Sequence, residues 1–164
     1  MNKGKLHIGT KLLLALPMSR ADYCLYRGWD LPDDEDGTDL GQLVEYVDGG
    51  EPNHSEHKGY ISWSPQDVFD NSYKASGEMS FGMAIEAAKR GYKVARSGWN
   101  GAGMFACIGN ASCNSNTAPA LRGYFDNDEV PFRACWYLKT AQNDVATWAP
   151  SGSDSLSSDW CIVE

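Results

Sequence analysis

The alternation of apolar and polar positions in the second half of the chain predicts one helix followed by short strands. The apolar positions from Phe81 to Ala88 recur at helical spacing, Ser80 is placed as an N-cap, and Gly91 follows the last turn. Clusters of Gly, Asn and Asp separate five later apolar runs, which are YKVARS, MFACI, FRACWYLKT, VATWA and WCIV. We predict a helix packed on an antiparallel β-meander.

The first half shows a different order of elements. Ser19 and Ser64 are placed as helix N-caps, and Pro65 would be the first helical residue after Ser64. The predicted helices cover 19–28 and 64–74, and the predicted strands cover 43–49 and 59–64. The chain is therefore predicted to be α+β, with a small α+β accessory module at residues 1–76 and a second domain at 77–164.

Composition and charge narrow the possible partners. The chain has 164 residues, of which 42% are hydrophobic, and a formal net charge of -8. Most of this charge lies in the first half, and the second half is nearly neutral, so we expect no nucleic acid polymer as partner and place any anionic ligand in the second half. The apolar run Leu12–Leu16 is too short to cross a membrane and no cleavable signal surrounds it, so we expect no membrane contact and a cytoplasmic protein.

Catalytic and metal-binding patterns are weak in this sequence. The five cysteines form no C-x-x-C pair and are expected to be reduced thiols. The HSEH run at 54–57 has metal-ligand spacing, but without a helix or a third ligand near it in the sequence we interpret it as a surface loop. No nucleophile elbow, P-loop or G-x-G-x-x-G run is present, and all histidines lie in the first half. We therefore expect no enzyme, no metal and no cofactor.

Two segments rich in tryptophan are the candidate binding elements. In SGWNGAGMF (97–105), the glycines allow close approach of a ligand, Trp99 could stack on a base, and Asn100 could contact a base edge or a ribose. The alternative is a hairpin with Trp99 as a core residue. In WAPSGSDSLSSDW (148–160), hydroxyls and backbone donors could form an anion-binding nest, the alternative being a capped turn that leads into the last strand.

Together these segments resemble a known phage family. The run MSFGMAIEAAKRGYKVARSGWNGAGMF, then FRACWYLKT, then WAPSGSDSLSSDW is similar to the anti-Thoeris sponge family, the second type of Thoeris anti-defence protein. The resemblance covers residues 79–164 and implies a homotetramer that acts in the host cytoplasm. It also implies that the protein binds cyclic nucleotide immune signals, namely cyclic ADP-ribose isomers and for some members cyclic dinucleotides, without cleaving them. Ala102 replaces a lysine that is frequent in the family, and the loop after Ile108 is longer than in short members.

The resemblance and the residues give one set of candidate ligand contacts. Trp99 and Trp148 would stack on bases, Arg96 would meet phosphate, as could Lys139, and Asp154 would contact ribose hydroxyls. The full candidate set is Arg96, Trp99, Asn100, Met104, Trp148, Ser151, Ser153 and Asp154. Two other functions stay open, a cyclic-nucleotide hydrolase and a protein-binding or virion-associated phage module. In the protein-binding alternative, the acidic first half would contact the partner protein. Otherwise the first half would give structural support or an added contact surface.

Overall fold

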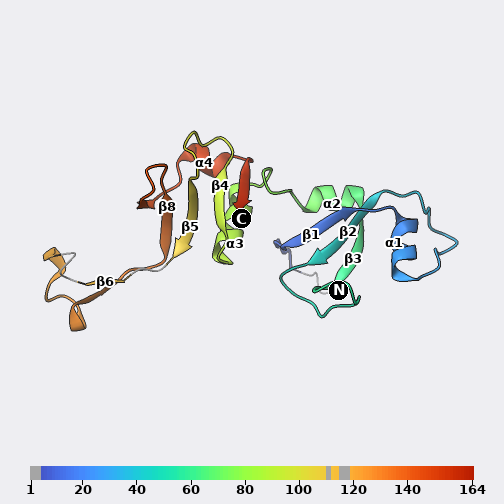
Figure 1. Cartoon of the computed structure of the whole chain (residues 1–164), viewed down its shortest axis with the longest axis horizontal. Coiled ribbons are helices and arrows are strands. Elements are labelled where there is room, and N and C mark those ends of the chain that lie inside the picture. The colour runs from blue at the N-terminus through green and yellow to red at the C-terminus, as the bar shows by residue number, and fades with distance from the viewer. Residues whose placement is uncertain (1–4, 110–111, 115–118) are drawn as a thin grey trace. The chain divides into compact units, whose positions relative to one another are not determined.

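The chain forms two compact units in the computed structural model, which describes residues 5–109, 112–114 and 119–164 (Figure 1). The first unit ends at Lys74, and the second covers Ala75–Glu164. The predicted division lies two residues later, after residue 76. Within the described residues, no helix is long and apolar enough to cross a membrane.

The first unit is a three-stranded antiparallel sheet accompanied by two helices. Strand order is β1-β2-β3, and Leu43 of the central strand lies opposite Leu16 on one side and Trp63 on the other. The elements in chain order are β1 (Leu13–Pro17), α1 (Arg20–Arg27), β2 (Gly41–Tyr46), β3 (Ile61–Pro65) and α2 (Gln66–Ser72). Strand β1, which the apolar run 12–16 did not lead us to predict, forms one edge of the sheet.

Local signals explain the ends of α1 but not the start of α2. The Ser19 hydroxyl accepts a hydrogen bond from the Asp22 backbone amide, and Gly28 ends α1 in the left-handed conformation at φ 68°. For α2 the predicted N-cap was wrong, because Pro65 itself occupies the N-cap position and no side chain caps the helix. Helix α1 contributes Tyr23 to a small core with Leu43 and Ile61.

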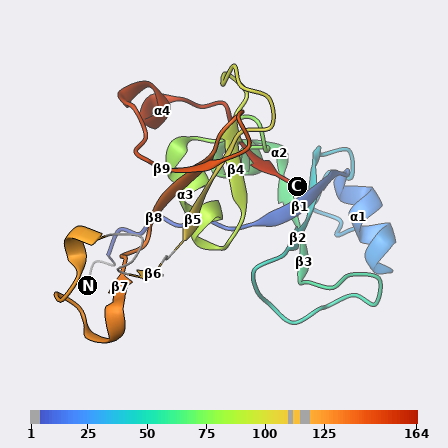
Figure 2. The ribbon, with the colours of Figure 1, turned by 60° about the vertical axis from the view of Figure 1, so that its left-hand side comes forward.

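The second unit is a five-stranded antiparallel sheet with helix α3 on one face (Figure 2). Its strands are β4 (Lys93–Arg96), β5 (Phe105–Gly109), β8 (Cys135–Lys139), β9 (Val145–Trp148) and β10 (Trp160–Val163), and its helices are α3 (Phe81–Lys89) and α4 (Gly152–Leu156). The predicted α+β class, the helix capped by Ser80 and the five strands are confirmed. The order β10-β4-β5-β8-β9 shows that the last strand does not extend the meander but returns to pair with β4.

The long segment between β5 and β8 forms a separate small element. Strands β6 (Ser112–Asn114) and β7 (Glu129–Pro131) pair antiparallel, and two short 3₁₀ turns, η1 (Pro119–Leu121) and η2 (Asp126–Asp128), lie between them. This element forms a sheet of its own and does not extend the five-stranded sheet. The strands β6 and β7 were not predicted.

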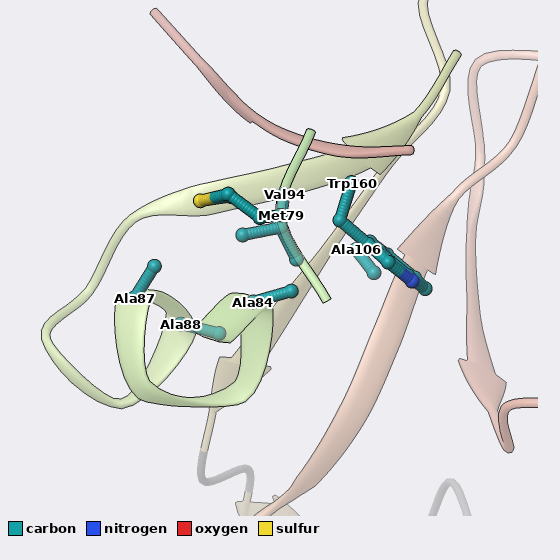
Figure 3. Close-up of a cluster of buried hydrophobic side chains, with 7 residues drawn as sticks. All are labelled: Met79, Ala84, Ala87, Ala88, Val94, Ala106 and Trp160. Carbon is teal, nitrogen blue, oxygen red and sulfur yellow. The ribbon is translucent and has the colours of Figure 1, made fainter. Parts of the chain in front are cut away.

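Small helix residues allow close packing of α3 on the sheet. Ala84 and Ala88 are almost fully buried against Val94 of β4 and Ala106 of β5, which lie opposite one another in the sheet (Figure 3). Trp160 of β10 fills the centre of this core and has no exposed surface. Because alternate strand residues face the same side, the residues on this face include Arg96, Trp136 and Trp148, which leads directly to the candidate site.

Candidate functional site

Arg96 lies between two aspartates at one end of the sheet. Its Nη1 donates to Asp154 Oδ1 at 2.9 Å, and its Nε donates to Asp159 Oδ1 at 2.8 Å. A longer bond of 3.4 Å joins Nη2 to Asp159 Oδ2, so the guanidinium holds Asp159 through two nitrogens. Arg96 thus connects β4 to α4 and to the residue before β10, and we call these three residues the arginine clamp.

Asp154 accepts hydrogen bonds at both carboxylate oxygens. Oδ1 also accepts from Trp99 Nε1 at 3.2 Å, while Oδ2 accepts from the Ser151 amide at 2.9 Å and from the Ser151 hydroxyl at 2.6 Å. The Ser151 hydroxyl in turn accepts from the Asp154 amide, which completes a capping box at the start of α4. Burial would raise the pKa of Asp154, but the hydrogen bonds from Ser151, Arg96 and Trp99 outweigh it and hold that pKa well below its usual value.

Asp159 ties the loop after β4 to the rest of the site. Its Oδ2 accepts from the Gly98 amide at 2.9 Å and from the Ser97 hydroxyl at 3.3 Å. The hydrogen bond from Arg96 lowers the pKa of Asp159, so this carboxylate also stays ionised. A side chain at position 98 would collide with the carboxylate, since a Cβ there would lie 2.9 Å from Asp159 Oδ2.

Five aromatic rings meet beside the arginine clamp and form what we call the aromatic cluster: Phe81, Trp99, Trp136, Trp148 and Trp160. The rings of Trp99 and Trp148 are edge-to-face, with centroids 5.7 Å apart and planes at 82°. Only Trp160 is fully buried, and its Nε1 donates to the Asp154 carbonyl at 3.0 Å. The other four rings are half-buried, so each presents part of its surface to solvent.

The glycine loop between β4 and β5 carries the remaining candidates. Asn100 is exposed, whereas Met104 is half-buried and folds back over Gly101. A Cβ at Gly101 would lie 2.1 Å from the Met104 sulfur, which explains the glycine there. Lys139 Nζ lies beside Gly103, whose φ of 66° is in the left-handed region, so a cation of β8 is close to this loop.

The structure brings most predicted residues together but uses several of them internally. Arg96 and Asp154 bind each other, and the amides of Ser151 and Asp154 have internal acceptors, so at these two positions the segment forms a helix N-terminus and not the open nest we described. The exposed hydroxyl of Ser153 lies 2.9 Å from that of Ser151. Whether the candidate set contacts a ligand stays a prediction.

Three residues of the site were not among the predicted contacts. Asp159, Trp136 and Phe81 were not in the candidate set, although the first completes the clamp and the other two extend the aromatic cluster. The spacing S-x-x-D from Ser151 to Asp154 is a capping-box signal that could have revealed α4. Nothing local to Asp159 predicts its pairing with Arg96, which lies 63 residues earlier in the chain.

The site has no metal-binding geometry. Nowhere in the described part of the chain do three or more His, Cys, Asp or Glu side chains gather as metal ligands would. The histidines of the HSEH run lie in the first unit, where His54 stacks on Tyr26 with ring centroids 4.6 Å apart and His57 contacts Glu45.

Comparison with known proteins identifies the unit that carries this site. Residues 79–163 match the family described as Tad2-like, the Thoeris anti-defense 2-like domain. The protein named Thoeris anti-defense 2 from Bacillus phage SP01 is 40% identical over 86 residues, which cover 52% of this chain and 96% of that protein. The match spans α3 through β10, and the first unit lies outside it. The chain therefore belongs to the Thoeris anti-defense 2-like family.

Proposed function

We propose that the second unit binds a cyclic nucleotide immune signal and holds it without cleaving it, so that the effector of the defence system is not activated. The ligand would be a cyclic ADP-ribose isomer or a cyclic dinucleotide. Support comes from the near-complete coverage of the SP01 relative, whose name states that it acts against Thoeris defence. The observation that carries the proposal is the aromatic cluster, in which Trp99 and Trp148 are fixed but not sealed in the core.

The geometry of the two indoles suggests how bases are held. Their planes lie at 82°, so one base does not fit between them, and each indole offers its own exposed surface. Stacking of this kind contributes about 1–3 kcal/mol per base. Asn100 and Ser153 are exposed beside these rings and supply polar contacts, while Met104 adds an apolar one.

We assign Arg96 and Asp154 a positioning role within this site. The two side chains form an ion pair with each other, and Asp154 fixes the Trp99 ring by accepting a hydrogen bond from Trp99 Nε1. Ser151 holds Asp154 in place through the capping box. A phosphate contact with Arg96 would require the clamp to open. Lys139 pairs with Phe105 and so belongs to the other face of the sheet, where its Nζ could meet a phosphate only beside Gly103 of the glycine loop.

A second copy of the chain would complete the pocket. A sponge that competes with an effector needs affinity near nanomolar, or about -12 kcal/mol, and two stacked bases do not supply it. The sheet face opposite α3 carries half-buried Phe105, Cys107 and Tyr137, which is a surface suited to packing against another subunit. We propose a homotetramer with ligand enclosed between subunits, where exclusion of water strengthens the phosphate hydrogen bonds.

The state of the two carboxylates supports binding over hydrolysis. Asp154 and Asp159 both have lowered pKa values and are hydrogen-bonded to Arg96, so they stay ionised at neutral pH and do not act as proton donors. The second unit contains no histidine to replace them. The host cell cytoplasm, where immune signals accumulate, would be the place of action.

The direct test separates the three functions. The pure protein is mixed with a cyclic ADP-ribose isomer, freed of unbound ligand and heat-denatured, and the released nucleotide is analysed by chromatography. Intact nucleotide supports the sponge, and a converted product supports a hydrolase. If no cyclic nucleotide from a panel is retained, a protein-binding module is favoured, and the acidic first unit should then capture a protein partner.

Matched variants locate the binding. Trp148→Ala should weaken retention about tenfold or more, since one stacking surface is lost. The exposed-residue variant Asn100→Ala leaves the core intact and should also weaken it. Trp29→Ala, which removes an exposed tryptophan from the first unit, should retain ligand like the original protein. Equal retention by all three variants would contradict the assignment, and native mass spectrometry gives the oligomeric state.

A further inference from the structure

A tyrosine-lined pocket in the first unit lies outside the region that matches the family. It has a volume of about 400 Å³ and is lined by Lys11, Tyr46, Gly49, Gly50, Tyr60 and Tyr73. We call it the tyrosine pocket. Its volume is within the range of about 300–1,000 Å³ that is usual for small-molecule sites. All of its residues belong to the first unit, so it is complete without the second.

The tyrosines come from three elements that meet at one end of the sheet. Tyr46 at the end of β2 and Tyr60 just before β3 are cross-strand neighbours, with the Tyr46 amide donating to the Tyr60 carbonyl at 3.0 Å. Their ring centroids lie 6.4 Å apart and their planes are tilted by 34°. Tyr73 follows α2, and its pKa is raised by burial and by a hydrogen bond with Tyr46. Tyr46 and Tyr73 are thus held together, and Tyr60 has 44% of its surface exposed.

Lys11 gives this aromatic pocket a positive group. Its ammonium lies 5.3 Å from the centre of the Tyr46 ring, at cation–π distance. The Val47 amide donates to the Leu12 carbonyl at 3.0 Å, so pairing with β2 continues past the start of β1 and holds Lys11 at this end of the sheet. The nearby Asp48 carboxylate accepts a hydrogen bond from the Leu12 amide at 3.1 Å and helps to hold the same segment.

The glycine turn after β2 keeps the pocket open. Gly50 has a φ of 99°, and a Cβ there would lie 2.8 Å from Tyr60 Cβ. A larger residue would push against Tyr60 and displace this ring of the pocket lining. The turn therefore gives backbone close access to the pocket, as glycine turns do where a ligand approaches the main chain.

We propose that the tyrosine pocket binds a small aromatic molecule that carries an anionic group, for which a nucleoside monophosphate is the simplest probe. The tyrosine rings supply stacking surfaces, their hydroxyls supply hydrogen bonds, and Lys11 pairs with the anion. Because the first unit is acidic, binding of an anion in this pocket depends on Lys11. Residues 1–74 carry many more acidic than basic side chains, so an anion is repelled unless a cation meets it directly.

Calorimetric titration of the full chain tests this site with three probes, which are AMP, adenosine and inorganic phosphate. AMP should bind at one site per chain in the first unit, and adenosine and phosphate should each bind at least about tenfold more weakly, since each lacks one of the two recognised groups. Tyr60→Ala and Lys11→Gln should each weaken AMP binding about tenfold or more. Lys11→Gln should leave adenosine binding unchanged, because only the ion pair is lost.

Controls of the same residue types separate this site from general effects. Tyr124→Ala removes a tyrosine of the second unit with 79% exposure, and Lys5→Gln removes an exposed lysine ahead of β1. Both should bind AMP like the original protein. Tyr60→Ala should still retain the cyclic ADP-ribose isomer, which keeps the two sites distinct.

Three results with AMP and adenosine would overturn the inference. They are absence of AMP binding, AMP binding that Tyr60→Ala and Lys11→Gln leave intact, and adenosine binding as tight as that of AMP. Binding of choline in preference to AMP would also overturn it, since the pocket would then be a cage for cations. Failure of the sponge experiment would leave these outcomes unaffected, because the pocket does not depend on the second unit.

Discussion

The two units fix their loops with polar networks of different chemistry. In the second unit the arginine clamp holds the glycine loop and α4 through a guanidinium between two carboxylates. In the first unit Glu45 performs the comparable task, since its Oε1 accepts from the amides of Lys58 and Gly59, both at 2.9 Å. Its Oε2 lies 2.8 Å from His57 Nδ1, and His57 Nε2 lies 2.9 Å from the Tyr26 hydroxyl.

The arginine clamp and the Glu45 network differ in chemistry because they position different parts of the molecule. The guanidinium keeps its charge at every accessible pH and its two carboxylate partners have lowered pKa values, so the aromatic cluster keeps its geometry until acid protonates those carboxylates. The Glu45 network is built from a carboxylate, an imidazole and a phenol, and it positions a loop of the unit whose small core cluster is Tyr23, Leu43 and Ile61. The site proposed to bind a signal tightly therefore has the more permanent frame, as preorganised binding requires.

The largest effect is expected from breaking the clamp. Arg96→Met should lower the free energy of unfolding of the second unit by about 3–5 kcal/mol, because Asp154 is buried and would lose its charge partner. Urea unfolding followed by tryptophan fluorescence measures this change. Arg133→Met removes an exposed arginine of the same unit and should change little. Similar losses in both variants would show that the clamp is not what stabilises the unit.

Acid should reduce the effect of the clamp. Asp154 and Asp159 have folded-state pKa values below their unfolded ones, so their contribution is full above about pH 4 and is lost as pH falls through the folded values. The stability difference between the original protein and Arg96→Met should thus shrink below about pH 4. Urea unfolding at a series of pH values measures it. A difference that stays constant down to pH 2 would contradict the paired charges.

A smaller effect is expected from the corresponding change in the first unit. Glu45→Ala removes the acceptor of two backbone amides and of His57, and should cost about 1–3 kcal/mol in the first unit alone. Thermal unfolding that resolves the two units, or hydrogen exchange of the Lys58 and Gly59 amides, measures the loss. Glu51→Ala, at an exposed position of the same loop, is the control. Faster exchange in the second unit as well would contradict this local role.

The smallest effect concerns the cap of α4. Ser151→Ala removes the hydroxyl that takes part in the capping box and should cost about 1 kcal/mol. The change should also loosen Asp154 and so increase the solvent exposure of Trp99, which fluorescence quenching detects. Ser158→Ala, an exposed serine after the same helix, should do neither. An unchanged stability would show that Arg96, Trp99 and the Ser151 amide fix the Asp154 carboxylate without the hydroxyl.

Local patterns were sufficient for elements that a few neighbouring residues specify. The Ser80 cap and the apolar spacing of α3 gave that helix, and the Ser19 cap with Gly28 gave α1. The alternating runs gave all five strands of the second sheet. Strand β1 was missed because its apolar residues are consecutive, which hides the two faces that its pairing with β2 creates.

Only part of the candidate site was predicted, because local patterns do not show contacts between distant segments. The sequence identified Trp99, Trp148 and Arg96 as residues of interest, since indoles and cations in glycine- and serine-rich segments suggest ligand contacts. It did not show that the Arg96 guanidinium is held by two carboxylates, because both partners lie more than 50 residues away in the chain.

The sequence by itself determined the family, the class of fold and the segments that carry the site, because periodicity, caps and short motifs are properties of neighbouring residues. Only the tertiary structure decided that β10 returns to pair with β4, with Trp160 opposite Arg96. That pairing brings Asp159 and α4 next to Arg96, and it places Trp160 in the core. Arg96 and Asp154, which the sequence suggested as free ligand contacts, thereby become part of the frame that holds the indoles. Contacts between distant strands depend on the free energy of the whole packed unit, which no single segment encodes.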